Sequence, residues 1–166
     1  MELLEYYQNQ RHVSENYVPR KCQLPPDGDI NLFGVRGAGK SSIIFDLIQD
    51  KDEESTLYID LDDPNLIFNP LSSLVLQQYI DREGITLLIL DHYTEGYLPY
   101  FPNVKRLIIL SRIALEQKEM TPVELFPLDY EEFLAFESST AKSSGFNHFL
   151  RAGTCLLYTS DAADDK

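Results

Sequence analysis

The sequence predicts an α/β fold in which a parallel β-sheet is sandwiched between helices. Three observations support this prediction. Short, almost continuous runs of Ile, Leu and Val recur along the chain, which is typical of strands buried on both faces. Segments with helical periodicity separate these runs. The first run leads through a glycine-rich turn into a helical segment, and ligands of such sheets bind at the carboxyl ends of the strands.

The first elements of the chain are a helix, a connection and a strand. An amphipathic helix is expected to begin at Leu3 and to end near His12. Residues 18–28 include prolines at three positions, so we expect an extended connection there. Residues 30–33 are the first predicted strand, and residues 42–49 place Ile and Leu side chains on one helical face.

The middle of the chain continues the alternation of strands and helices. Residues 50–54 are acidic and predict a solvated turn. A strand is expected over residues 56–61. It is followed by a helix over residues 71–81 that stops at Gly84.

Three further elements complete the predicted sheet and its helices. Residues 85–90 carry no charge, which indicates a strand buried on both faces, and Asp91 is expected to terminate it. Another strand is expected over residues 104–110. A short edge strand over residues 123–126 precedes a helix over residues 130–137. Strands and helices are therefore expected to alternate throughout.

The glycine-rich turn has a specific pattern. Residues 34–41 read G-V-R-G-A-G-K-S and match the phosphate-loop (Walker A) motif G-x-x-x-x-G-K-[ST] in full. Such a loop turns backbone N–H groups and the positive end of the following helix toward phosphates, Lys40 would reach the terminal phosphates, and Ser41 would bind magnesium. The motif predicts a nucleoside triphosphate site; a merely flexible turn is the alternative. The residues expected to bind the nucleotide are Gly34, Gly37, Ala38, Gly39, Lys40, Ser41 and Ser42.

Asp91 stands where a second phosphate-site motif is expected, at the end of an apolar run. Its carboxylate would hold magnesium through water, opposite Ser41. The alternative interpretation is a buried strand with a polar end. Given the phosphate loop upstream, we expect Ser41 and Asp91 to be the metal-binding residues.

The residue after Asp91 bears on whether the protein hydrolyses the nucleotide. Hydrolysing proteins with a phosphate loop usually carry Glu after the metal-binding Asp, as the general base that polarises water, and this chain carries His92. His92 could act as the base, Glu95 could take that role from the following loop, or the site could bind ATP and only switch conformation. A histidine that satisfies hydrogen bonds at a strand end is an equal alternative.

Polar residues near the other strand ends are weaker candidates. Ser111 is placed to contact the terminal phosphate or to orient water, and Arg112 could approach the phosphates or a neighbouring subunit. A capped turn is the alternative for both. Arg36 could lean on a phosphate or face solvent, and residues 60–63 could add outer contacts, although a solvated loop is the simpler interpretation.

Composition and charge argue against several classes of protein. The formal charge of −13 argues against a broad basic surface for nucleic acid or anionic lipid. Cys22 and Cys155 fit neither a disulfide framework nor a zinc site. The N-terminus carries Glu2 and Glu5 where a signal peptide needs positive charge, and no apolar stretch approaches the roughly 18 residues of a membrane span. We expect a cytoplasmic protein with a core sufficient for one domain.

Several segments together resemble a family of prokaryotic AAA-type ATPases over residues 30–154. They are the phosphate loop, Y-I-D-L-D-D-P at 58–64, L-L-I-L-D at 87–91, the strand that ends at Ser111, P-L-D-Y-E-E-F-L at 127–134, and F-L-R-A-G at 149–153. The resemblance implies a P-loop NTPase core of the ASCE type, with the strand ending at Ser111 between the phosphate-loop strand and the strand ending at Asp91. It assigns Gly34, Gly39, Lys40 and Ser41 to phosphate and magnesium, Asp91 to the metal, and Ser111 to the sensor role.

The chain departs from that family at His92 and at its end. The helical lid and C-terminal domain that the family normally has are missing, so we expect a fragment truncated before the lid. The expected domains are an N-terminal helix and linker over 1–28, an incomplete ATPase core over 29–154, and a non-native tail over 155–166. That tail resembles a translated sequencing-adapter read; an ordinary polar tail is the alternative.

The predicted function is ATP binding with Mg²⁺ in an AAA-type ATPase. The alternative is a non-hydrolysing, nucleotide-dependent interaction module, for which His92 is the chief argument. A GTPase is disfavoured because the chain has no [NT]-K-x-D motif, and a small-molecule kinase because no Arg-rich lid is visible. An unknown protein partner and a homo-oligomer of the full-length protein stay open.

Overall fold

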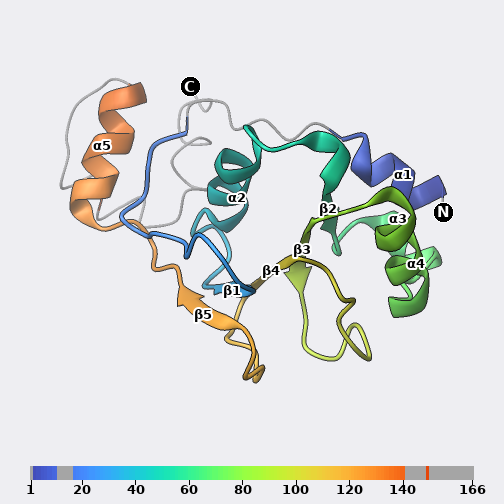
Figure 1. Ribbon diagram of the computed structural model, residues 1–166. Helices are drawn as coiled ribbons and strands as arrows, with labels where there is room; N and C mark the ends of the chain where they lie inside the picture. Colours follow the sequence, from blue (N-terminus) through green and yellow to red (C-terminus); the bar gives the residue numbers. More distant parts are fainter. Residues whose placement is uncertain (1, 11–16, 141–148, 150–166) are drawn as a thin grey trace.

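A computed structural model describes residues 2–10, 17–140 and 149 of the chain. Within them, five parallel strands form one sheet in the order β2-β3-β4-β1-β5. The strands are β1 (Ile30–Phe33), β2 (Thr56–Asp60), β3 (Leu87–Tyr93), β4 (Arg106–Ser111) and β5 (Thr121–Glu124). The predicted α/β class with a parallel sheet is confirmed (Figure 1).

Helices cover both faces of the sheet. The helical elements are α1 (Glu2–Gln8), α2 (Lys40–Ile48), the 3-10 turn η1 (Glu53–Ser55), α3 (Pro64–Phe68), α4 (Ser73–Glu83) and α5 (Tyr130–Thr140). Side chains of α2 pack on one face, and side chains of α1, α3 and α4 pack on the other. Helix α5 lies at the β5 end of the sheet (Figure 1).

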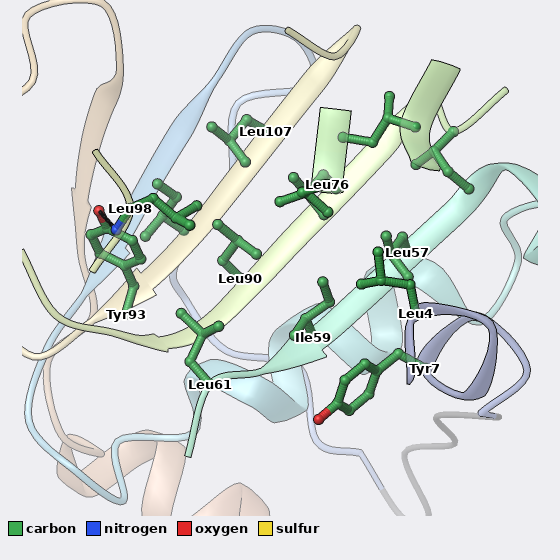
Figure 2. Close-up of a cluster of buried hydrophobic side chains, with 14 of the residues drawn as sticks. Leu4, Tyr7, Leu57, Ile59, Leu61, Leu76, Leu90, Tyr93, Leu98 and Leu107 are labelled. Atoms are coloured by element: carbon green, nitrogen blue, oxygen red, sulfur yellow. Dashed lines mark hydrogen bonds between the residues drawn. The ribbon is translucent and has the colours of Figure 1, made fainter. Parts of the chain in front are cut away.

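The two layers of core follow from the alternation of side chains along each strand. In β2, Leu57 and Ile59 face α1 and α4, whereas Tyr58 faces α2. Figure 2 shows the first of these layers, with Leu4 of α1 and Leu76 of α4 among the strand side chains. Strands buried on both faces explain why their sequences are almost continuously apolar.

The expected central position of β4 is confirmed. Ile108 of β4 pairs with Ile30 of β1 on one side and with Ile89 of β3 on the other. β5 is an edge strand, as expected, and its edge position tolerates Pro122, which cannot donate a backbone hydrogen bond. Helix α4 ends at Gly84, which has a left-handed backbone with φ 68°.

Two expectations about the second half of the chain are wrong. Strands and helices do not alternate throughout, because residues 94–105 and 112–120, all described, contain no helix. Pro99 and Pro102 disfavour a helix in the first of these connections. Asp91 does not terminate β3, because the strand continues to Tyr93.

The end of β3 contains an irregularity. Three steps along β3, from Leu90 to Tyr93, face two steps along β4, from Ile109 to Ser111. This is the geometry of a β-bulge, which often redirects side chains next to active sites. His92 lies in the bulge with φ 56°, the one non-glycine residue with positive φ among those described.

Some expectations lie on residues outside the described part of the chain. These are most of the F-L-R-A-G turn at 149–153 and the tail over 155–166, including Cys155. Among the helices that the structure describes, none has the length and apolar character needed to cross a membrane.

Candidate nucleotide site

The phosphate loop connects the carboxyl end of β1 to the first turn of α2. Gly37 and Gly39 adopt left-handed backbone conformations with φ 79° and 93°, which glycine reaches without steric cost. Gly39 is the N-cap of α2, and among the described residues no side chain caps that end of the helix. The N–H groups of the first turn have no intrahelical acceptor, so they are available to an anion.

A cavity of about 700 Å³ opens beside this helix end. Its wall combines the phosphate loop with the carboxyl ends of β3 and β4, as expected for a parallel sheet. The predicted site residues on this wall are Gly37, Gly39, Lys40, Ser41, Ser42, Asp91, His92 and Ser111. Gly34 and Ala38 do not line it; both are buried residues of the loop itself.

The ammonium group of Lys40 is held by the loop itself. Nζ donates to the carbonyl oxygens of Gly34, at 2.7 Å, and Val35, at 3.0 Å. Burial lowers the pKa of Lys40, and the charge of Asp91 partly opposes that shift. A desolvated ammonium bound only to neutral carbonyls gains when an anionic phosphate replaces one of them.

Ser41 and Asp91 lie together on the cavity wall. Ser41 Oγ donates to Asp91 Oδ2 at 2.6 Å, and the Asp91 side chain is buried. The second carboxylate oxygen accepts the backbone N–H of His92 at 2.7 Å. A hydroxyl and a carboxylate oxygen side by side are hard ligands of the type that Mg²⁺ takes, so the donor set fits this ion.

The imidazole of His92 is oriented by a neighbouring strand. Its Nδ1 lies 2.7 Å from Asp60 Oδ1, whereas Asp62 Oδ2 is 4.0 Å away. A carboxylate only accepts hydrogen bonds, so Nδ1 carries the proton and neutral His92 has its lone pair on Nε2. Asp60 is the last residue of β2 and pairs with Asp91 in the sheet.

Ser111 also lies on the cavity wall, but its hydroxyl is engaged by the protein. It donates to the carbonyl of Ile113 at 2.6 Å and accepts from Asn31 Nδ2 at 2.8 Å. Asn31 Oδ1 in turn accepts the N–H of Leu115 at 2.9 Å. Buried Asn31 thus connects Ser111 to the loop that presents Arg112 to the cavity.

The remaining polar residues on the cavity wall are all exposed, and they are Arg36, Asp62, Thr94, Glu95 and Arg112. Together with the phosphate loop they place positive and negative groups around one cavity at the end of the sheet. Residues 29–98, which include the phosphate loop and Asp91, match the family model described as an AAA domain. This match supports an AAA-type P-loop ATPase family member. A search of curated proteins found no match to it.

The matched segment contains site residues that sequence reasoning missed or undervalued. Asp60 was assigned to a solvated loop, yet it contacts His92. Asn31 and Tyr58 were expected only to be strand residues. In the structure, Asn31 donates a hydrogen bond to Ser111 and Tyr58 donates one to Asp91. The available signal was a polar side chain inside a buried strand, because such groups require a specific partner.

Tyr58 provides a test of the hydrogen-bond network around Asp91. Its hydroxyl donates to Asp91 Oδ2 at 2.5 Å, and burial and the Asp91 charge raise the pKa of Tyr58, which keeps the hydroxyl protonated. Tyr58→Phe is expected to lower the free energy of unfolding by about 2 kcal/mol without Mg²⁺ or nucleotide, measured by urea denaturation.

Tyr97→Phe is the matched control for that substitution. The Tyr97 hydroxyl is buried and has no hydrogen-bond partner among the described residues. Removing it should change the free energy of unfolding by less than about 0.5 kcal/mol. Equal effects of the two substitutions would contradict the importance of the Tyr58 contact with Asp91.

Proposed function

We propose that this AAA domain binds ATP with Mg²⁺ in the cavity beside α2 and hydrolyses it. The observation that carries the proposal is the meeting of Lys40, Ser41 and Asp91 at the uncapped N-terminus of α2. An uncapped helix end supplies N–H donors, Lys40 supplies positive charge, and the other two residues supply oxygen ligands.

Each group has a defined role in this proposal. The N–H groups of residues 37–42 bind the phosphates, and Lys40 Nζ exchanges loop carbonyls for phosphate oxygens. Ser41 Oγ and the Asp91 carboxylate hold Mg²⁺, which when bound neutralises charge on the β- and γ-phosphates. The hydrogen bond between Ser41 and Asp91 keeps both groups at the same place on the cavity wall.

His92 is the proposed general base. Nε2 accepts a proton from water as the water oxygen bonds to the γ-phosphorus. The bond from that phosphorus to the β–γ bridging oxygen breaks, and ADP and inorganic phosphate result. Asp60 holds the Nδ1–H tautomer and thereby leaves Nε2 as the basic nitrogen, the arrangement that a carboxylate imposes on histidine in other hydrolases.

The second candidate is an AAA domain that binds ATP without turning it over. It is favoured by the lack of a carboxylate at position 92 and by the left-handed backbone of His92. A non-glycine residue held at positive φ stores strain, and such strain is found in switch segments as well as at active sites.

ATP turnover by the wild type, His92→Ala and His92→Glu separates the hydrolysing from the non-hydrolysing candidate. With the whole chain, magnesium-dependent ATP binding is measured by calorimetry and turnover by phosphate release. If His92 is the base, His92→Ala lowers kcat about 100-fold or more while the Kd for ATP stays within about threefold, and His92→Glu retains turnover. No wild-type turnover, together with a gain in His92→Glu, would identify the non-hydrolysing domain.

Asp60→Asn tests the orienting contact in the same assays. It should lower kcat about tenfold with little change in KM, because Asp60 acts through His92 and does not touch the substrate. Asp62→Asn is the control, since Asp62 lies farther from the imidazole and is exposed. Equal effects of the two substitutions would remove Asp60 from the proposal.

A further inference from the structure

Arg20 joins three parts of the chain that are distant in sequence. Its side chain is only 6% exposed. Nη1 donates to the carbonyl of Ala38 in the phosphate loop at 2.5 Å, and Nη2 donates to the carbonyl of Phe126 after β5 at 2.8 Å. Nε donates to Glu132 Oε1 in α5 at 2.9 Å. One guanidinium group therefore holds the loop, the β5–α5 connection and α5.

The α5 end of this network is itself well ordered by hydrogen bonds. Glu132 N–H donates to Asp129 Oδ1 at 2.8 Å, and Asp129 N–H donates to Glu132 Oε2 at 3.2 Å. These reciprocal bonds form a capping box at the N-terminus of α5. Glu132 thus caps α5 and binds Arg20 with the same carboxylate, so the guanidinium cannot shift without disturbing the cap.

The loop end of the network bears on nucleotide binding. A phosphate loop directs N–H groups toward the ligand, so its carbonyl groups need donors from elsewhere. Ala38 lies between Gly37 and Gly39, which both have left-handed backbones. Glycine allows many backbone conformations, so these two residues do not by themselves hold the loop in one of them. The guanidinium of Arg20 is the donor that holds the Ala38 carbonyl.

We propose that Arg20 is a positioning residue that orders the phosphate loop for ATP and couples ATP binding to α5. This inference rests on the proposed function. The guanidinium is a rigid planar fork with donors in several directions, so it can bind a loop carbonyl and a carboxylate simultaneously. ATP binding that orders the loop would then also stabilise the N-terminal cap of α5. By the same coupling, an ordered α5 cap would favour ATP binding.

Arg20→Gln and Arg20→Lys test the positioning role in the whole chain. Both are expected to raise the Kd for Mg·ATP about tenfold, because neither side chain can bridge Ala38, Phe126 and Glu132. Lys21→Ala is the matched control: Lys21 Nζ pairs with Asp129, just before α5, and with Glu131 in its first turn, and neither contact involves the phosphate loop. It should leave the Kd within about twofold. Arg20→Lys retains the charge if Arg20→Gln does not fold.

Amide hydrogen exchange tests the coupling, which a merely structural residue would not show. In the wild-type chain, Mg·ATP should slow exchange in residues 130–136 at least about fivefold. The slowing should vanish in Arg20→Lys and persist in Lys21→Ala. Two results would overturn this inference but leave the proposed function intact. One is a wild-type Kd for Mg·ATP in both Arg20 variants, and the other is amide exchange in α5 of the wild type that does not change when Mg·ATP binds. A wild-type chain that binds no ATP would instead overturn the proposed function and this inference with it.

Discussion

Lys40→Ala is expected to raise the Kd for Mg·ATP about 100-fold or more. The expected loss corresponds to about 3 kcal/mol, the upper end for hydrogen bonds to charged groups. The ammonium group of Lys40 already donates to the carbonyl oxygens of Gly34 and Val35 in the loop. A bound phosphate could therefore accept a hydrogen bond from Nζ without a large rearrangement. Calorimetric titration with Mg·ATP measures the loss directly.

The stability of the ligand-free protein separates a binding effect from unfolding. Burial lowers the pKa of Lys40, which means that the folded protein holds this charge at a cost. Alanine should therefore leave the ligand-free melting temperature within a few degrees of the wild type. Lys51→Ala, at an exposed position after α2, is the control for removal of a positive charge. ATP affinity within threefold of the wild type in Lys40→Ala would place the nucleotide elsewhere.

Gly34→Ala is expected to lower the free energy of unfolding by about 3 kcal/mol and to abolish ATP binding. A Cβ at this position would overlap the carbonyl oxygen of Leu125. That carbonyl cannot easily retreat, because the Leu125 N–H donates to Phe33 at 2.7 Å, directly beside β1. The clash therefore forces apart β1 and the segment after β5 at the base of the phosphate loop.

Gly84→Ala distinguishes this clash from the general cost of replacing a glycine. Gly84 has φ 68° and open space around its Cα, so alanine meets backbone strain without a collision. We expect a loss of about 1 kcal/mol in urea unfolding and unchanged ATP affinity. If Gly34→Ala were as mild as Gly84→Ala, the contact with Leu125 would not be rigid.

Much of the fold was predictable because its signals are local. A strand buried on both faces is apolar at nearly every residue, so β2, β3 and β4 were located from their runs of apolar residues. Gly84 marked the end of a helix, because glycine adopts the left-handed backbone that a helix end requires. The central position of β4 came from a family resemblance, because residue patterns do not specify strand order.

The end of β3 was not predictable for a physical reason. A carboxylate normally ends an apolar strand, so Asp91 was expected to be the last residue. The strand continues because Ser41 and Tyr58 satisfy the buried carboxylate. The bulge that turns His92 also depends on the pairing with β4, and no property of residues 90–93 alone specifies that register.

The sequence by itself determined the parallel α/β class, the positions of its main strands, and the candidate phosphate-binding residues. These depend on short patterns in which each residue's requirement is set by its neighbours in the chain. The tertiary structure alone decided that Asp60 contacts His92, that Asn31 holds Ser111, and that Arg20 joins Ala38 to Glu132. These side chains meet only when strands and loops distant in sequence pack together, because each buried polar group must then find its hydrogen-bond partner across the fold.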